Sequence, residues 1–302
     1  MSFPLSGRCL CAVSLLVIVM AWSVQAQAPS IDVRETNTGA IEVELGGQLL
    51  QDHELQFSRD LISWAPLLSL RLPSSPFEWI DPLASSQPGG FYRVTQWAGN
   101  APQDFADNFR LIDHEGRSQE LHYNSHLEAV VLLFIDPNCD GSLAAALADL
   151  ENTFGAQSVA FWIIDPVSEN RADLVAKALE WQVNMPILHD SAQLVARTYQ
   201  VERGTEAVAI DTATWSIFYR GAIDSSGDGN LPVQDYLPDA LTAFFAGQEA
   251  TFSRTPATDC VLPLAPIVPI SYEQIIAPML IENCVRCHSP GNIAPFTLSD
   301  YN

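Results

Sequence analysis

The sequence predicts an α/β fold, in which a three-layer domain is preceded by a small antiparallel β module and followed by a short helical segment. Three observations support this prediction. Residues 129–135 form a continuous apolar run, which a central strand covered on both faces requires. Strand and helix patterns of ordinary length then alternate up to Gly247. Before residue 100, short strand patterns instead alternate with Pro and Gly turns.

The first 26 residues have the pattern of a secretory signal peptide. They contain Arg8, no acidic residue and an apolar run from Cys9 to Trp22 that is too short to span hydrocarbon. Ala26 is a small residue at a suitable cleavage position, and an uncleaved membrane anchor is the alternative. We therefore expect a periplasmic or secreted protein that is soluble once the signal is removed.

Charge narrows the choice of partners. The chain has 14 Lys and Arg against 36 Asp and Glu, a net charge of −22, and Lys177 is its only lysine. Nucleic-acid binding needs clustered basic residues, so we exclude it. The acidic field favours basic partner proteins or cations.

Residues 27–99 are predicted to form the β module. Its strand patterns lie at residues 41–45, 54–58, 77–80 and 91–95, separated by Pro and Gly turns. The stretches 55–66, 75–82 and 90–94 resemble β modules at the front of exported bacterial proteins, which implies a sandwich-like fold and a binding or spacing role.

Residues 100–254 are predicted to form the three-layer domain. Its strand patterns are 108–113, 129–135, 159–164, 207–210 and 215–220, and its helices begin near Ser142, Arg171, Asp190 and Pro238. The Pro-rich stretch 255–270 is predicted to be a semi-rigid linker.

A single cysteine, Cys139, lies between the buried strand and the helix that follows it. A thiol at a helix N-terminus is stabilised as the thiolate, which is the nucleophile in disulfide exchange and peroxide reduction. Cys260 is either a resolving cysteine for Cys139 or an idle linker thiol.

Residues 101–246 resemble the thioredoxin-like redoxin and peroxiredoxin domains. The similar stretches are 108–117, the strand-to-Cys139 junction, 185–190 and 218–224. This resemblance implies an oxidoreductase of the thiol–disulfide or peroxidase (antioxidant) type. The chain departs from the family pattern because Ser142 stands where thioredoxins have a second cysteine, and no proline lies at 204–206. A redox-inactive binding scaffold therefore stays open.

Cys284-Val-Arg-Cys287-His288 is the haem c attachment pattern. Two thiols on one turn can each bond a haem vinyl group, and the adjacent His288 is then the axial iron ligand. The alternatives are a Cys284–Cys287 disulfide or half of a zinc site, for which this segment offers no further ligands.

Residues 270–296 resemble the start of bacterial cytochrome c domains. The family usually supplies a distal methionine, but no Met follows His288 and Met279 lies on the incoming helix. The haem would be open or ligated from outside, or the chain is a fragment.

The sequence thus predicts an exported redox protein with covalent haem c for electron transfer and thiol chemistry at Cys139. Its parts are a signal peptide 1–26, a β module 27–99, a thioredoxin-like domain 100–254, a linker 255–270 and a truncated cytochrome c-like segment 271–302. We expect an electron-transfer partner protein with a basic surface. An N-terminal fragment of a larger haem or metal oxidoreductase is the further alternative.

Overall fold

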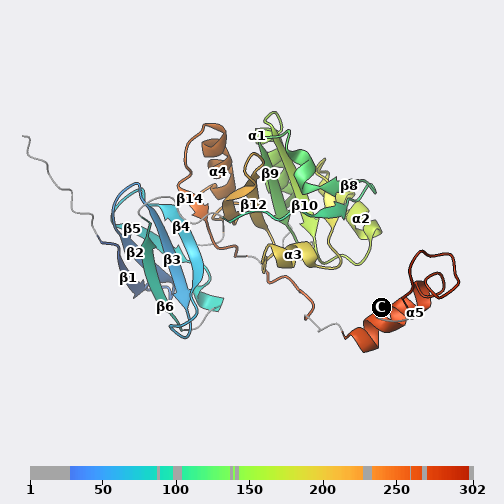
Figure 1. Ribbon diagram of the computed structural model, residues 1–302. Coiled ribbons are helices and arrows are strands. Elements are labelled where there is room, and N and C mark those ends of the chain that lie inside the picture. Colours follow the sequence, from blue (N-terminus) through green and yellow to red (C-terminus); the bar gives the residue numbers. More distant parts are fainter. Residues whose placement is uncertain are drawn as a thin grey trace, which may run out of the picture. The chain divides into compact units, whose positions relative to one another are not determined.

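The computed structural model describes residues 28–86, 89–97, 104–136, 139, 143–226, 233–258, 260–266 and 271–298. The predicted signal peptide lies outside these residues. The chain divides into two compact units, Met1–Ala101 and Pro102–Asn302, and each is described by itself (Figure 1). Across the described part of the chain, every helix is too short or too polar to cross a bilayer.

The first unit contains two antiparallel sheets of three strands each. One sheet has the order β1-β2-β5 and the other β4-β3-β6. The strands are β1 (Ser30–Glu35), β2 (Ile41–Gly46), β3 (Asp52–Ser58), β4 (Ala65–Arg71), β5 (Phe77–Asp81) and β6 (Phe91–Gln96).

Apolar side chains of both sheets form the core of this unit. Val43, Leu45 and Trp79 are buried in one sheet, and Leu55 and Leu68 in the other. The four strands predicted from the sequence correspond to β2, β3, β5 and β6, while β1 and β4 are additional. Four consecutive residues of β4, 67–70, are buried, so this strand does not show the alternation of apolar and polar residues by which the others were predicted.

The second unit is a mixed sheet in the order β11-β10-β9-β12-β13-β14. β9, β10 and β11 are parallel, β12 is antiparallel to β9, and β13 is antiparallel to β12. The strands are β9 (Ala129–Phe134), β10 (Val159–Asp165), β11 (Ile187–His189), β12 (Glu206–Asp211), β13 (Ser216–Gly221) and β14 (Phe252–Arg254). Every residue of β9 is buried, as expected for a central strand covered on both faces.

Helices cover both faces of this sheet. On one face, Phe154 at the end of α1 (Leu143–Phe154) contacts Phe161 of β10 and Phe245 of α4 (Tyr236–Phe245). On the other face, α3 (Leu194–Thr198) packs into a core cluster that includes Leu132 of β9. α2 (Arg171–Trp181) connects β10 to β11. This mixed α/β architecture was predicted from the sequence and is consistent with a thioredoxin-like fold.

The stretch predicted as a linker differs in the structure. The Thr255 hydroxyl accepts a hydrogen bond from the Ala222 N–H at 3.1 Å, and Leu262 is buried. The described residues of 255–266 therefore pack on the α/β unit rather than run free. A Pro-rich composition does not reveal this, because a few buried side chains and backbone hydrogen bonds suffice to dock an extended segment.

A tight hairpin precedes β9. Its strands, β7 (Arg110–Ile112) and β8 (Ser118–Glu120), flank a turn whose backbone N–H groups at Glu115 and Arg117 donate to the buried Asp113 carboxylate at 3.0 and 2.8 Å. Burial alone raises the pKa of Asp113, but hydrogen bonds from Gln119 and Arg117 outweigh it and bring the pKa below its ordinary value of 3.8.

We expect Asp113→Asn to lower the free energy of unfolding near pH 7 by about 1–3 kcal/mol, because it removes charge-assisted hydrogen bonds to a buried group. A depressed folded pKa contributes stability above 3.8, which is lost as the pH falls through the folded value. The difference between variant and wild type should therefore shrink from about pH 7 to about pH 3 in urea unfolding curves. An equal difference at both pH values would contradict the prediction.

The C-terminal part of the chain is a short helical segment. A turn over Tyr272–Ile276 leads into α5 (Ala277–Asn283), and the Ser271 hydroxyl caps the start by accepting from the Gln274 N–H at 3.2 Å. The residues of the CVRCH motif begin directly after α5.

Candidate functional site

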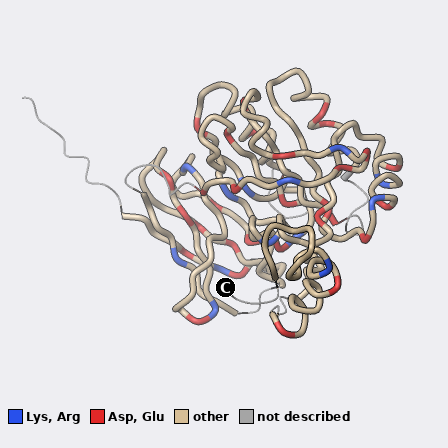
Figure 2. The backbone as a smooth tube through the Cα atoms, turned by 45° about the vertical axis from the view of Figure 1, so that its right-hand side comes forward, with Lys and Arg blue, Asp and Glu red and all other residues tan. Residues whose placement is uncertain are grey.

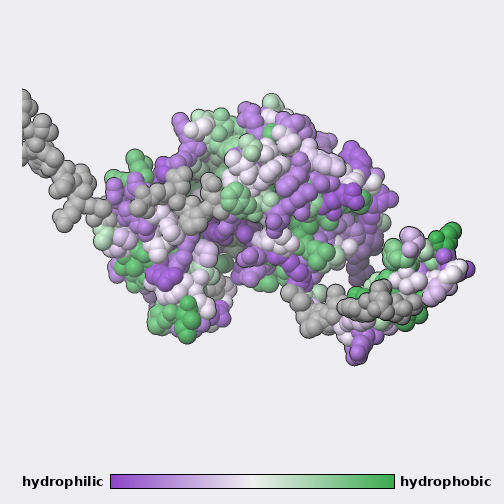
Figure 3. Space-filling view, viewed as in Figure 1, coloured by the Kyte–Doolittle hydropathy of each residue, from purple (hydrophilic) through white to green (hydrophobic). Residues whose placement is uncertain are grey.

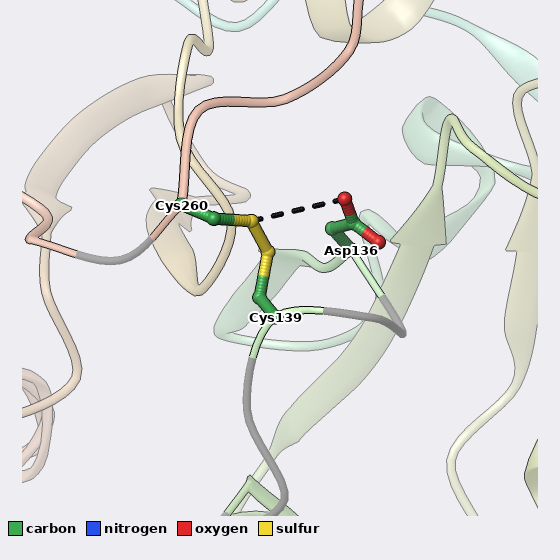
Figure 4. The surroundings of a disulfide bond; sticks show 3 residues. All are labelled: Asp136, Cys139 and Cys260. Atoms are coloured by element: carbon green, nitrogen blue, oxygen red, sulfur yellow. Dashed lines mark hydrogen bonds between the residues drawn. A yellow bond between two sulfur atoms is a disulfide. The ribbon is translucent and has the colours of Figure 1, made fainter.

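Cys139 and Cys260 form a disulfide, although 121 positions separate them in the sequence (Figure 4). Their Cα atoms are 5.7 Å apart, within the usual range for such bonds. Cys139 follows β9 in a turn closed by its own N–H, which donates to the Asp136 carbonyl at 3.0 Å. Residues 140–142, which join it to α1, lie outside the described residues, so the predicted effect of the helix N-terminus on the thiol stays a prediction.

Residues 260–266, which we call the strap, hold Cys260 in place. The strap pairs with the loop before β12: the Gly204 N–H donates to the Cys260 carbonyl at 2.9 Å, and the Leu262 N–H donates to the Glu202 carbonyl at 2.8 Å. At its far end, the Ala265 N–H donates to the Gln193 side chain at 2.7 Å. Cys260 is thus positioned by backbone hydrogen bonds as well as by its bond to Cys139.

Gly204 allows this close arrangement. A Cβ atom at this position would lie 3.1 Å from the Cys139 sulfur, which is tighter than most Cβ contacts, and 3.5 Å from the Asp136 backbone nitrogen, which is ordinary van der Waals contact. A larger residue at position 204 would require the Cys139 sulfur or the loop to shift by a few tenths of an ångström. The family resemblance places the loop before β12 at residues 204–206, where the proline is absent, and it gives no role to Gly204.

Asp136 was also missed by the sequence analysis. It lies just beyond β9, is buried, and directs its carboxylate at the disulfide, with Oδ2 3.7 Å from the Cys260 sulfur (Figure 4). In the dithiol form this carboxylate can accept a hydrogen bond from the Cys260 thiol. An acidic residue directly after the buried strand and three positions before a cysteine was the available signal, because strand ends of parallel sheets carry functional side chains.

The predicted haem c residues lie together on one turn. The N–H groups of Cys287 and His288 both donate to the Cys284 carbonyl, at 3.1 and 3.0 Å. Both thiols are free, Cys284 being half-buried and Cys287 exposed. The alternative disulfide between them is therefore not formed in this structure.

His288 is oriented by the chain that follows it. Its Nδ1 lies 3.1 Å from the Phe296 carbonyl oxygen, and its ring packs on the Phe296 ring with centroids 4.3 Å apart. A carbonyl partner at Nδ1 fixes the proton there and leaves Nε2 available as a ligand atom, and metal-bound histidines commonly make such a hydrogen bond through their other ring nitrogen. Two free thiols on one turn and an imidazole held in this way fit the requirements of covalent haem c.

Apolar side chains are exposed around this motif. Ile281 and Ile293 are 63% and 90% exposed, and Met279, Phe296 and Tyr272 are also exposed. Figure 3 shows hydrophobic residues on the surface of this helical segment. A segment of this size has no core of its own to bury them.

The acidic character of the sequence extends over both units. Figure 2 shows positions of Asp and Glu along the backbone of both units, with Lys and Arg in the minority. Several of the arginines are engaged in ion pairs, such as Arg220 with Glu206 at 2.7 Å and Arg254 with Asp104 at 3.1 Å.

Comparison with known proteins supports the fold. No protein-family model matches the chain, and no curated protein matches it. An uncharacterized conserved protein from Geobacillus kaustophilus is 23% identical with a TM-score of 0.51, and the match covers 55% of this chain and 93% of that one. A hypothetical protein from Sinorhizobium meliloti 1021 is 19% identical with a TM-score of 0.50, covering 56% and 97%.

The similar structures also include peroxidoxin BcpB from Mycobacterium tuberculosis, 20% identical with a TM-score of 0.35, covering 39% of this chain and 82% of that one. A score this low carries no argument, and the two higher matches show the fold alone. The comparisons thus support a mixed α/β fold for the second unit.

Proposed function

We propose that this chain is an exported thiol–disulfide oxidoreductase in which Cys139 and Cys260 are the redox-active pair, and which carries covalent haem c for electron transfer. The observation that supports the thiol part is the Cys139–Cys260 disulfide beside the buried Asp136. Ser142 stands three positions after Cys139, where thioredoxins have the second cysteine, and Cys260 of the strap is the partner instead.

In the dithiol form, the Cys139 thiolate attacks one sulfur of a substrate disulfide and releases one substrate thiolate. The Cys260 thiolate then attacks the Cys139 sulfur, closes the Cys139–Cys260 disulfide and releases the second substrate thiolate. The protein loses two electrons and two thiol protons, and the substrate disulfide takes up the electrons. The strap keeps Cys260 within reach for the second step, because its backbone is bonded to the loop at Gly204.

The test uses a chain in which Cys9, Cys11, Cys284 and Cys287 are replaced by Ala, so that Cys139 and Cys260 are the remaining thiols. The protein is equilibrated with mixtures of reduced and oxidised glutathione, and the fraction of disulfide is measured by thiol labelling and mass spectrometry. We expect a single two-electron transition. In this background Cys260→Ser should trap a mixed disulfide with glutathione at Cys139. Cys139→Ser should slow the reaction with oxidised glutathione by more than about tenfold.

Failure of the pair to interconvert under these conditions would overturn the proposal. It would favour the redox-inactive scaffold, in which the disulfide only fastens the strap. Equal reactivity of the two single variants would instead show that Cys139 is not the attacking thiol.

The haem part of the proposal rests on Cys284, Cys287 and His288. The two thiols would form the thioethers, and the Nε2 of His288 would ligate the iron. When bound, haem supplies a one-electron redox centre, and the exposed apolar side chains of this segment would lie against it. A basic partner protein would be attracted by the net charge of −22.

A further inference from the structure

Besides forming a disulfide, the Cys139 site brings together side chains that can act as metal ligands. Within the described residues, Asp136, Cys139 and Cys260 form a cluster in which one ligand atom from each, a carboxylate oxygen and two sulfurs, lies within 4.8 Å of the others. We propose that the reduced form of this site binds one Zn²⁺ ion through these three side chains, with water in the fourth position.

The spacing of the donors suits a tetrahedral zinc ion. With Zn–S near 2.3 Å and Zn–O near 2.0–2.2 Å, neighbouring sulfur and oxygen ligands of a tetrahedron lie about 3.5 Å apart. The Asp136 Oδ2 atom and the Cys260 sulfur are 3.7 Å apart. The sulfurs, which are bonded to each other in the oxidised form, need only to separate on reduction.

Backbone hydrogen bonds that do not involve the sulfurs join Cys139 to Asp136 and attach Cys260 to the loop at Gly204. The Cys139 N–H is bonded to the Asp136 carbonyl, and the Cys260 carbonyl is bonded to the Gly204 N–H. Neither these bonds nor the hydrogen bond that anchors the strap at Gln193 uses a sulfur atom, so we expect them to persist after reduction. The donor set therefore stays preorganised, which lowers the entropic cost of binding an ion.

The chemistry of the donors selects the ion. Two thiolates favour Zn²⁺ or Cu⁺ over Mg²⁺ or Ca²⁺, and a carboxylate as third ligand favours zinc, which accepts sulfur and oxygen together. The charge of +2 on the ion offsets two of the three negative charges that the donors carry in an acidic protein. Binding releases the two thiol protons and transfers no electrons. Because the same sulfurs form the disulfide, oxidation and zinc binding exclude each other.

The experiment uses the full chain with Cys9, Cys11, Cys284 and Cys287 replaced by Ala, reduced with a phosphine. Zinc is titrated against a chromophoric chelator, and Co²⁺ serves as a probe because thiolate ligation gives it a charge-transfer absorption. We expect one ion per chain. Cys139→Ser and Cys260→Ser should each weaken binding by more than about tenfold.

The carboxylate has a matched control. Asp165 is also buried and also lies at the end of a parallel strand, β10, but its carboxylate accepts from the Val167 and Ser168 N–H groups at 2.8 and 2.9 Å. Asp136→Asn should weaken zinc binding by about tenfold or more, and Asp136→His should restore it. Asp165→Asn should leave it unchanged.

Three results would overturn the proposal: no stoichiometric zinc binding, binding that survives either cysteine substitution, or equal affinities of the Asp136→Asn and Asp165→Asn variants. Equal affinities of these two variants would mean that the two thiolates hold the zinc ion without the Asp136 carboxylate. Circular dichroism of each reduced variant shows whether it is folded. The zinc titration involves no redox exchange, so it can fail while the glutathione equilibrium of the proposed function succeeds, and the reverse.

Discussion

Reduction of the Cys139–Cys260 disulfide is expected to lower the free energy of unfolding of the α/β unit by about 2–5 kcal/mol. The disulfide stabilises the fold because it restricts the conformational entropy of the unfolded chain. It joins residues 121 positions apart, and for a loop of that length the loss of entropy corresponds to a stabilisation of about 5 kcal/mol. Urea unfolding followed by circular dichroism, with and without a phosphine reductant, measures the difference.

Two variants act as controls for this prediction. The double variant Cys139→Ser/Cys260→Ser should unfold like the reduced protein and should no longer respond to reductant. The variant Cys284→Ala/Cys287→Ala, whose thiols are free in the structure, should keep both the stability and the response of the wild type. Unchanged stability on reduction would show that the strap is fastened by its hydrogen bonds and by Leu262 alone.

Co-expression with the cytochrome c maturation machinery is expected to add the mass of one haem to the wild-type chain and none to Cys284→Ala/Cys287→Ala. Each thioether needs one of these thiols, and the turn after α5 presents both of them next to His288. Intact mass and reduced-minus-oxidised absorption spectra measure the outcome.

The control for haem attachment is the variant Cys139→Ser. Cys139 lies outside the CVRCH turn, so this variant should retain the haem. His288→Ala should change the absorption spectrum of any attached haem, because the axial nitrogen is removed. Wild-type protein without added mass under these conditions would contradict the haem part of the proposed function and leave the thiol part intact.

The features that the sequence predicted are those specified locally. The run 129–135 predicts a central strand because only a strand covered on both faces is apolar at every position, and β9 is buried throughout. The CVRCH turn is set by spacing, since residues three apart on one turn are neighbours whatever the rest of the chain does. Strands such as β2 and β3 were predicted because apolar and polar residues alternate along them, which is a local pattern.

Other features depend on contacts between distant residues. β4 was missed because its burial follows its neighbours rather than a period of two. The linker prediction missed the strap, because docking of residues 260–266 depends on the loop at Gly204 and on Gln193.

The sequence by itself determined the α/β arrangement, the position of Cys139 after a buried strand and the CVRCH turn, because each follows from local periodicity or spacing. Only the tertiary structure decided that Cys260 is the partner of Cys139 and that Asp136 faces both sulfurs. The physical reason is that the sheet places the end of β9 beside the loop before β12, where the strap pairs. No pattern within a short stretch of sequence contains that proximity.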